Sequence, residues 1–168
     1  GMLQGDASDL FINVKPSARL GVTTQGASRI YSQRLPNECQ ANLQATVDKE
    51  ALLVYAPDPC SLFAASSFSQ QQDFSIHPDS SVVLVDWFSS GRYCNGEHWA
   101  FDKLSSRTSL KWLGEEDSQP FLQDSVSMDL RIKQTNPSET DPLGVYNFHA
   151  FASLILYGKE TDEIKKQC

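Results

Sequence analysis

The sequence has no apolar run long enough to cross a bilayer. Its apolar stretches, such as those at residues 82–85 and 154–156, fall far short of the roughly 20 residues that a membrane span requires. Positive charge is also scarce: 14 Lys and Arg stand against 21 Asp and Glu, a formal net charge of −7, which repels phosphate backbones and anionic lipid. We therefore expect a folded protein that binds neither a membrane nor nucleic acid.

Signals for secretion and for a disulfide framework are absent as well. The first residues contain no basic segment followed by an apolar one, which is the pattern of a secretory leader, so the expected location is the cytoplasm. The four cysteines, Cys39, Cys60, Cys94 and Cys168, stand singly without a C-x-x-C spacing. In a chain of 168 residues this pattern is typical of free buried thiols.

Motifs for enzymatic chemistry are missing too. The chain has no G-x-S-x-G nucleophile elbow and no phosphate-binding G-x-x-x-x-G-K-[ST] loop, so neither route to hydrolysis is indicated. Cys94 and His98 flank an Asn-Gly turn, whereas a structural zinc needs four converging donors. We expect no tight metal site and no catalysis. Paired carboxylates from Asp86, Glu97 and Asp124 leave a β-rich hydrolase as the alternative.

What the sequence does contain is alternation of apolar and polar residues, which predicts β-strands with one buried face. Strands are expected at residues 10–14, 19–24, 43–47, 51–55, 68–76, 108–113 and 125–130. Residues 148–157 fit a helix or a strand by periodicity, and their aromatic residues and the following Gly158 favour a strand. Residues 81–88 differ, because their continuous apolar run with β-branched residues is typical of a strand covered on both faces. We expect that strand at the centre of the core.

Turn signals suggest how these strands connect. The short polar break between residues 43–47 and 51–55 predicts a hairpin, and Asn95-Gly96 predicts a second, tight hairpin. The mostly polar strand at 68–76 is expected at a sheet edge or against a wet surface. No internal sequence repeat is visible. The expected fold is all-β, with mainly antiparallel stacked sheets and few short helices, one of them beginning at Thr161.

Five segments together resemble the UreD (UreH) family of urease accessory proteins, and their residues resemble its eukaryotic members more than its bacterial ones. They read GMLQGD at 1–6, TTQGASRIY at 23–31, PDP at 57–59 with Phe63 and Gln70 after it, DWFSSGR at 86–92 and GEHWAF at 96–101. The matching motif positions are Thr23, Thr24, Gln25, Tyr31, Pro57, Asp58, Pro59, Trp87, Gly91, Arg92, Gly96, Glu97 and Trp99. Gly26 replaces an Ala of the family pattern, and Arg29 replaces a Lys.

The resemblance also implies a division of the chain. It extends from Gly1 to about Gly158, so residues 1–158 are expected to form a UreD-like β domain. Residues 159–168 are then the start of a C-terminal helix or tail. Members of the family carry further sequence before and after this region, so the chain is expected to be the central part of a longer protein.

In function, the resemblance implies a non-enzymatic protein that helps to assemble the nickel centre of urease. Its partners would be a UreF-type helical protein, a UreG-type GTPase and the urease apoprotein. An internal water-filled tunnel is implied to carry nickel(II) in transit, with no cofactor tightly bound. Position by position, the tunnel residues correspond to Asp6, Ser28, Asp86 and Asp124, the last of which is a glutamate in some members.

The residues themselves are compatible with such a passage. Clustered imidazoles and thiolates would hold nickel too tightly to release it, whereas scattered carboxylates and hydroxyls bind it weakly. Burying Asp86 beside residues 82–85 would be costly without water or a partner, so a wet passage is one explanation of that residue. The other is a turn carboxylate that accepts backbone hydrogen bonds. Exposed strand edges and apolar faces also predict association of the chain when it is made alone.

Overall fold

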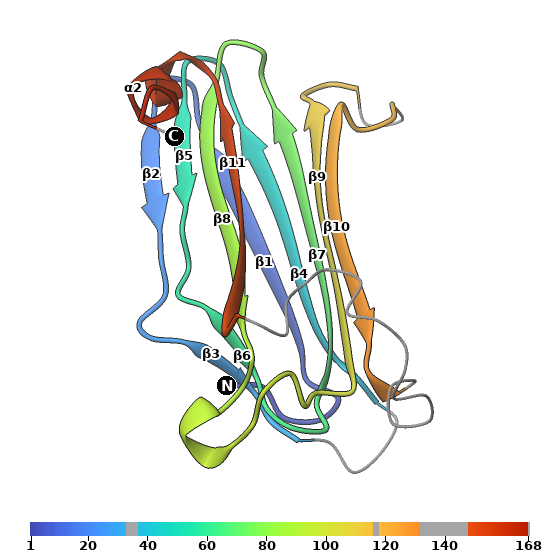
Figure 1. Ribbon diagram of the computed structural model, residues 1–168. Helices are drawn as coiled ribbons and strands as arrows, with labels where there is room; N and C mark the ends of the chain where they lie inside the picture. Colours follow the sequence, from blue (N-terminus) through green and yellow to red (C-terminus); the bar gives the residue numbers. More distant parts are fainter. Residues whose placement is uncertain (33–36, 116–117, 132–147, 168) are drawn as a thin grey trace.

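The computed structural model describes residues 1–32, 37–115, 118–131 and 148–167. They form two β-sheets, here called sheet A and sheet B (Figure 1). Sheet A contains β2 (Arg19–Val22), β3 (Ser28–Ile30), β5 (Leu52–Tyr55), β6 (Cys60–Leu62), β8 (Ser81–Ser89) and β11 (Ala150–Tyr157). Sheet B contains β1 (Ala7–Val14), β4 (Cys39–Val47), β7 (Ser67–Ile76), β9 (Lys103–Trp112) and β10 (Leu122–Asp129).

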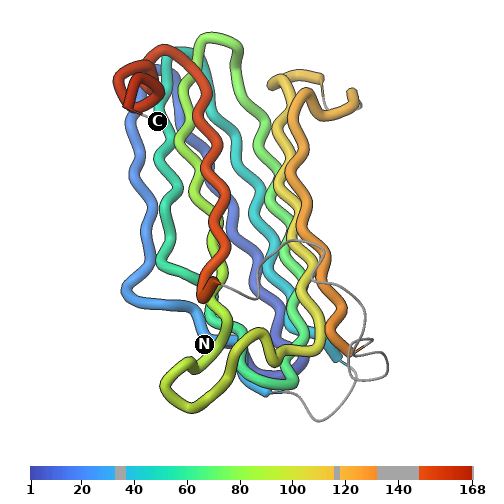
Figure 2. Tube along the Cα trace, in the orientation of Figure 1, coloured from blue at the N-terminus to red at the C-terminus, as the bar shows by residue number. Residues whose placement is uncertain are grey.

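The chain winds between the two sheets as a β-solenoid, as Figure 2 traces. Strands β1, β4, β7 and β9 pair in parallel, in that order, in sheet B. Strands β2, β5 and β8 pair in parallel in sheet A, and so do β3, β6 and β8. Among the described strands, β10 and β11 alone run antiparallel to their neighbours, which are β9 and β8.

The all-β class is confirmed, but the expected antiparallel pairing is wrong, because these sheets are mainly parallel. Residues 43–47 and 51–55 form no hairpin, since β4 lies in sheet B and β5 in sheet A. The polar strand β7 lies in the middle of sheet B and not at its edge. Alternation determines which face of a strand is buried, but it leaves the neighbouring strand undetermined.

The Asn95-Gly96 hairpin is also wrong. The dipeptide ends a short 3₁₀ helix, η1 (Tyr93–Asn95), and Gly96 adopts a left-handed conformation with φ of 78°. Trp99 has φ of 49°, so the backbone after the turn is not extended there and no strand forms. Trp99 is nevertheless buried, and its ring meets that of Phe101 edge-on with the ring centroids 6.0 Å apart.

The interior contains two apolar clusters at different levels along the strands. One cluster includes Leu43, Phe74, Val82, Leu84 and Leu110, and the other includes Ile30, Phe68, Phe88, Phe101 and Leu104. Strand β8 contributes to both clusters and is paired along both edges, with β5 and β6 on one side and β11 on the other. The expected central position of residues 81–88 is therefore confirmed, but only one face is fully covered, since Val83 and Val85 on the other face are half-buried.

The C-terminal part and the cysteines complete the fold. After β11 come η3 (Lys159–Thr161) and α2 (Asp162–Lys165). Thr161 precedes α2 as expected, but its hydroxyl donates to the Gly158 carbonyl and does not cap the helix. Cys39, Cys60 and Cys94 are free thiols, and Cys168 lies outside the described residues. In the part of the chain that the structure describes, no helix is both long and apolar enough to span a membrane.

The outer face of sheet A is apolar, which predicts self-association. Val54, Val83 and Leu156 are register partners there, as are Val85 and Leu154, and Leu154 is 50% exposed. Large exposed apolar patches drive association of isolated domains. We expect the chain alone to elute in size-exclusion chromatography at twice the monomer mass or more, and Leu154→Gln to shift it towards the monomer. Elution of the unmodified chain as a monomer at high concentration would contradict this prediction.

Candidate functional site

Sheet A is interrupted at the level of Asp86. Residues 23–27 separate β2 from β3, and residues 56–59 separate β5 from β6. Along β8, pairing with β5 ends at Leu84 and pairing with β6 begins at Phe88, so Asp86 lies opposite the second interruption. That segment contains Pro57 and Pro59, which have no N–H to donate to a ladder. The sheet therefore opens beside Asp86.

The two interrupting loops are tied together by reciprocal hydrogen bonds. The Asp58 N–H donates to Thr24 Oγ1 at 2.8 Å, and the Thr24 hydroxyl donates to Asp58 Oδ2 at 3.2 Å. The Gly26 N–H donates to the same carboxylate oxygen at 2.8 Å, and Trp87 Nε1–H donates to the Pro57 carbonyl at 2.8 Å. These motif residues thus hold the opening of sheet A in shape.

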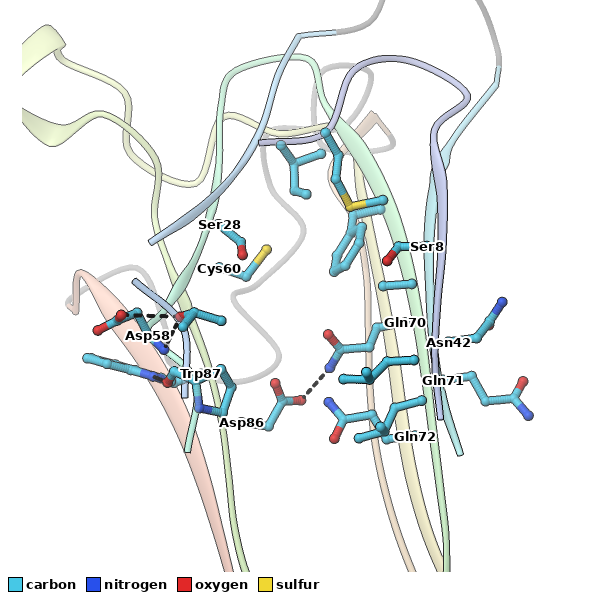
Figure 3. Close-up of a pocket in the computed structure, with 18 of the residues that line it drawn as sticks. Ser8, Ser28, Asn42, Asp58, Cys60, Gln70, Gln71, Gln72, Asp86 and Trp87 are labelled. Carbon is cyan, nitrogen blue, oxygen red and sulfur yellow. Dashed lines mark hydrogen bonds between the residues drawn. The ribbon is translucent and has the colours of Figure 1, made fainter. Parts of the chain in front are cut away.

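A cavity of about 270 Å³ opens at this gap (Figure 3). Ser28 and Cys60 lie on the sheet A side, and Gln70 and Gln72 lie opposite them on β7. Asp86 reaches from β8 across the cavity towards Gln70. The cavity is open to solvent at the end of the solenoid formed by β1 and β3, since residues of both strands line it.

Asp86 is the acidic group at the inner end of this cavity. Its Oδ2 accepts hydrogen bonds from Gln70 Nε2 and from Ser106 Oγ, each at 3.0 Å. Burial raises the pKa of the Asp86 carboxyl above its ordinary value; the two hydrogen bonds oppose this, and the charge of Asp124 adds to it. The donors are side chains of neighbouring strands, and Asp86 lies within β8, so the alternative of a turn carboxylate with backbone partners is wrong.

Polar side chains continue from Asp86 to the last strand of each sheet. In sheet B, Gln72, Thr108 and Asp124 are register partners on β7, β9 and β10. In sheet A, Ser153 on β11 is the register partner of Asp86, so the two share one face of the sheet. The Ser153 hydroxyl donates to Asp124 Oδ2 at 2.6 Å. We call Gln70, Gln72, Asp86, Ser106, Thr108, Asp124 and Ser153 the polar belt.

The polar belt separates the two apolar clusters of the core. On β7, Gln70 and Gln72 lie between Phe68 and Phe74, and on β8, Asp86 follows Leu84. Burying polar groups costs free energy unless they are hydrogen-bonded, and side chains of the belt bond one another. Within the belt, Gln70, Gln72 and Asp86 face the cavity.

Cys60 also lines the cavity. Burial, and secondarily the charge of Asp86, raises the pKa of its thiol to about 12. Without a metal beside it the side chain is therefore a neutral thiol at neutral pH, and the charged group of the cavity near it is the Asp86 carboxyl.

Three of the four residues expected to line a tunnel belong to this region. Ser28 and Asp86 line the cavity, with Ser28 exposed at the mouth, and Asp124 continues the polar belt. Asp6 lies apart: it is exposed, and its carboxylate accepts the Leu3 N–H at 2.7 Å in the turn before β1. That bond fixes the first residues, of which Gly1 and Met2 line the cavity mouth.

Glu97 belongs to a separate structural cluster. Its carboxylate pairs with Arg92 and accepts the Ala64 N–H at 3.2 Å, and Arg92 lies over the Phe63 ring, 4.4 Å from its centroid. The hydrogen bond from Arg92 is the main reason that the pKa of Glu97 is lowered. Glu97 therefore fixes the loop around Gly91 and does not line the cavity with Asp86.

Side chains that bind metals strongly do not converge in the described residues, where no three His, Cys, Asp or Glu side chains form a group able to hold a metal ion. One imidazole pair that the sequence did not reveal is present: the His98 and His149 rings have centroids 4.9 Å apart. Thr108 and Ser153 were not identified as site residues from the sequence either. The sequence feature that could have indicated a polar site is the position of Gln70 and Gln72, which fall on the same face of their strand as buried phenylalanines.

The fold and the site together define a β-solenoid protein whose interior is crossed by a polar, oxygen-lined region open at one end. The family model described as UreD urease accessory protein matches residues 1–168. The chain belongs to this family. Its accessory proteins are not enzymes, so the hydrolase alternative is not retained.

Several curated relatives support the assignment. Urease accessory protein D of Arabidopsis thaliana is 32% identical over 168 residues, covering 99% of this chain and 54% of that protein. The protein of the same name from Oryza sativa subsp. japonica is 33% identical over 168 residues, covering 99% and 51%. Urease accessory protein UreH of Helicobacter pylori is 24% identical over 136 residues, covering 81% and 49%. The chain thus spans about half the length of these relatives.

Proposed function

We propose that this chain is the cavity-bearing part of a urease accessory protein that passes nickel(II) to the urease apoprotein. The observation that carries the proposal is Asp86, a carboxylate held inside an open cavity among polar side chains of both sheets. The proposed partners are a UreF-type accessory protein, a UreG-type GTPase and urease itself. Residues 1–158 would form the β domain, and residues 159–168 would begin a further element of a longer protein.

The size and lining of the cavity suit a hydrated divalent cation. Six water molecules occupy about 180 Å³ at about 30 Å³ each, and the cavity offers about 270 Å³. Oxygen groups at several separate positions bind such an ion weakly at each step, which allows it to leave again. The net charge of −7 favours capture of cations over anions.

Asp86 is suited to bind the cation without holding it permanently. Burial raises the pKa of its carboxyl, so the ionised form is disfavoured when no cation is present. A cation placed beside the carboxylate favours the ionised form, so binding of the ion relieves this cost.

Closing the mouth of the cavity should stop this passage. Ser28→Phe places a ring at the mouth, and we expect nickel per urease active site to fall about tenfold when the full-length variant and its partners activate the apoprotein. Ala27→Phe, one residue earlier and outside the cavity lining, serves as the matched control and should leave nickel loading unchanged. Equal loading by the two variants would show that nickel does not enter here.

A further inference from the structure

We infer that the passage leaves the solenoid between β10 and β11, and that the hydrogen bond from Ser153 to Asp124 closes it there. This inference rests on the proposed function. It assigns Ser153 as a positioning residue that competes with the metal for the Asp124 carboxylate.

The topology places β10 and β11 at the end of the described solenoid that lies opposite the cavity mouth. Strand β10 is the last strand of sheet B, and β11 pairs in sheet A with β8. The cavity mouth lies at the opposite end, where β1 and β3 are the outermost strands. From β1 to β10 there are four spacings of about 4.8 Å, or about 19 Å. In sheet B the polar belt runs along half of this distance, from β7 to β10.

The side chains along that path follow one another without an apolar interruption. Gln70 Nε2 bonds both Asp86 and Ser106, the latter at 3.3 Å. Next to Asp86 on the same face of sheet A is its register partner, Ser153, which bonds Asp124 in sheet B. Asp86 and Asp124 also lie close enough for their charges to interact. A cation held by Asp86 therefore has Asp124 as its next acidic ligand.

The Ser153–Asp124 hydrogen bond joins the two sheets at the end of this path. At 2.6 Å it is a short bond to a carboxylate, of the stronger, charge-assisted kind. For Asp124 to take up the cation, its Oδ2 must exchange the hydroxyl of Ser153 for the metal. Breaking this bond is the step that opens the exit, and no other described side chain bonds that carboxylate.

The inference is tested by the rate at which the metal leaves. The chain is loaded with Ni²⁺, mixed with an excess of a chromogenic chelator, and followed by stopped-flow absorbance. Ser153→Ala removes the donor, and we expect release to become about tenfold faster, the factor that corresponds to about 1.4 kcal/mol. Ser153→Thr keeps the hydroxyl and should retain the unmodified rate. Asp124→Asn weakens the last acidic ligand and should slow release.

Two outcomes separate this inference from the proposed function. If Ser153→Ala and Asp124→Asn both release nickel at the unmodified rate while Asp86→Asn no longer binds it, the exit lies elsewhere and the inference is overturned. If Asp86→Asn binds and releases nickel as the unmodified chain does, the proposed function itself fails. Ala152→Val, on the exposed side of β11, controls for disturbance of that strand.

Discussion

Replacing Asp86 by Asn is expected to lower nickel loading of urease at least about tenfold and also to stabilise the protein at neutral pH. The amide keeps the size of the side chain but has no negative charge to attract a cation. It also removes a charge whose burial is unfavourable. Loss of function together with a gain of stability is the signature of a residue retained for function.

The pH dependence of this stability difference has a definite sign. The pKa of Asp86 is raised in the folded chain above the ordinary 3.8, mainly by burial. Between these two pKa values the folded state holds a proton that the unfolded state has lost, so the free energy of unfolding falls as pH rises. The free-energy cost of burying the ionised Asp86 carboxyl is absent below pH 3.8 and complete above the pKa of the folded state. The stability advantage of Asp86→Asn should therefore grow with pH across this interval, to on the order of 1 kcal/mol.

Asp73 provides a matched control for Asp86. It too accepts hydrogen bonds from a glutamine and a serine, Gln71 and Ser109, but it belongs to the outward positions of β7 between the buried Gln72 and Phe74. Asp73→Asn should leave nickel loading unchanged. Nickel per active site and urea unfolding across pH 3 to 8 are the measurements. Equal nickel loading by the two variants, or an advantage of Asp86→Asn that shrinks as pH rises, would contradict this account of Asp86.

Gly158→Ala is expected to destabilise the chain by about 3 kcal/mol or more. Gly158 follows β11 and has φ of 87°, and an added Cβ would lie 2.2 Å from the Ser80 carbonyl oxygen and 2.4 Å from Ser81 Oγ. The free-energy cost of the strained backbone and the cost of the close contact with the neighbouring backbone add together. The end of β11 would have to move away from β8, which disturbs the register that places Ser153 beside Asp86.

Gly114 separates the two contributions to that loss. It has a similar φ of 89°, but a Cβ would meet no atom of the described residues within 4 Å. Gly114→Ala should therefore show only the backbone strain, about 1–2 kcal/mol. Urea unfolding of both variants measures the difference. Equal destabilisation by the two substitutions would mean that Gly158 is not held against residues 80–81 as the structure shows.

The strands could be predicted from the sequence, but their neighbours could not. Alternation correctly located β4 and β7, because burial of one face is a local property of the pattern, and the continuous apolar run located β8. Parallel neighbours lie far apart in the chain: Ala7 pairs with Gln40, Gln40 with Ser69, and Ser69 with Ser105. These coils have similar backbones without a visible sequence repeat, so the solenoid had no periodic signal. A short polar break was interpreted as a hairpin, but in the structure it leads from one sheet to the other.

The candidate site was predictable only in part, for a related reason. Ser28, Asp86 and Asp124 came from the family resemblance, which carries over single positions. Ser153 has an ordinary residue type in an apolar strand, and its importance arises from pairing with Asp86 across two strands 67 residues apart. The glutamines of β7 were visible as an in-phase polar pair, but the sequence left open whether they indicated an edge strand or a strand against a wet surface, and β7 is central with both glutamines lining the cavity.

The most direct test of the central claim is to locate nickel in crystals of the chain. Crystals soaked in Ni²⁺ would be measured at the nickel absorption edge, with Asp86→Asn crystals as the comparison. The account predicts anomalous density inside the cavity beside the Asp86 carboxylate, and its loss in the variant. Nickel bound at the His98 and His149 rings, with none in the cavity of the unmodified chain, would contradict it.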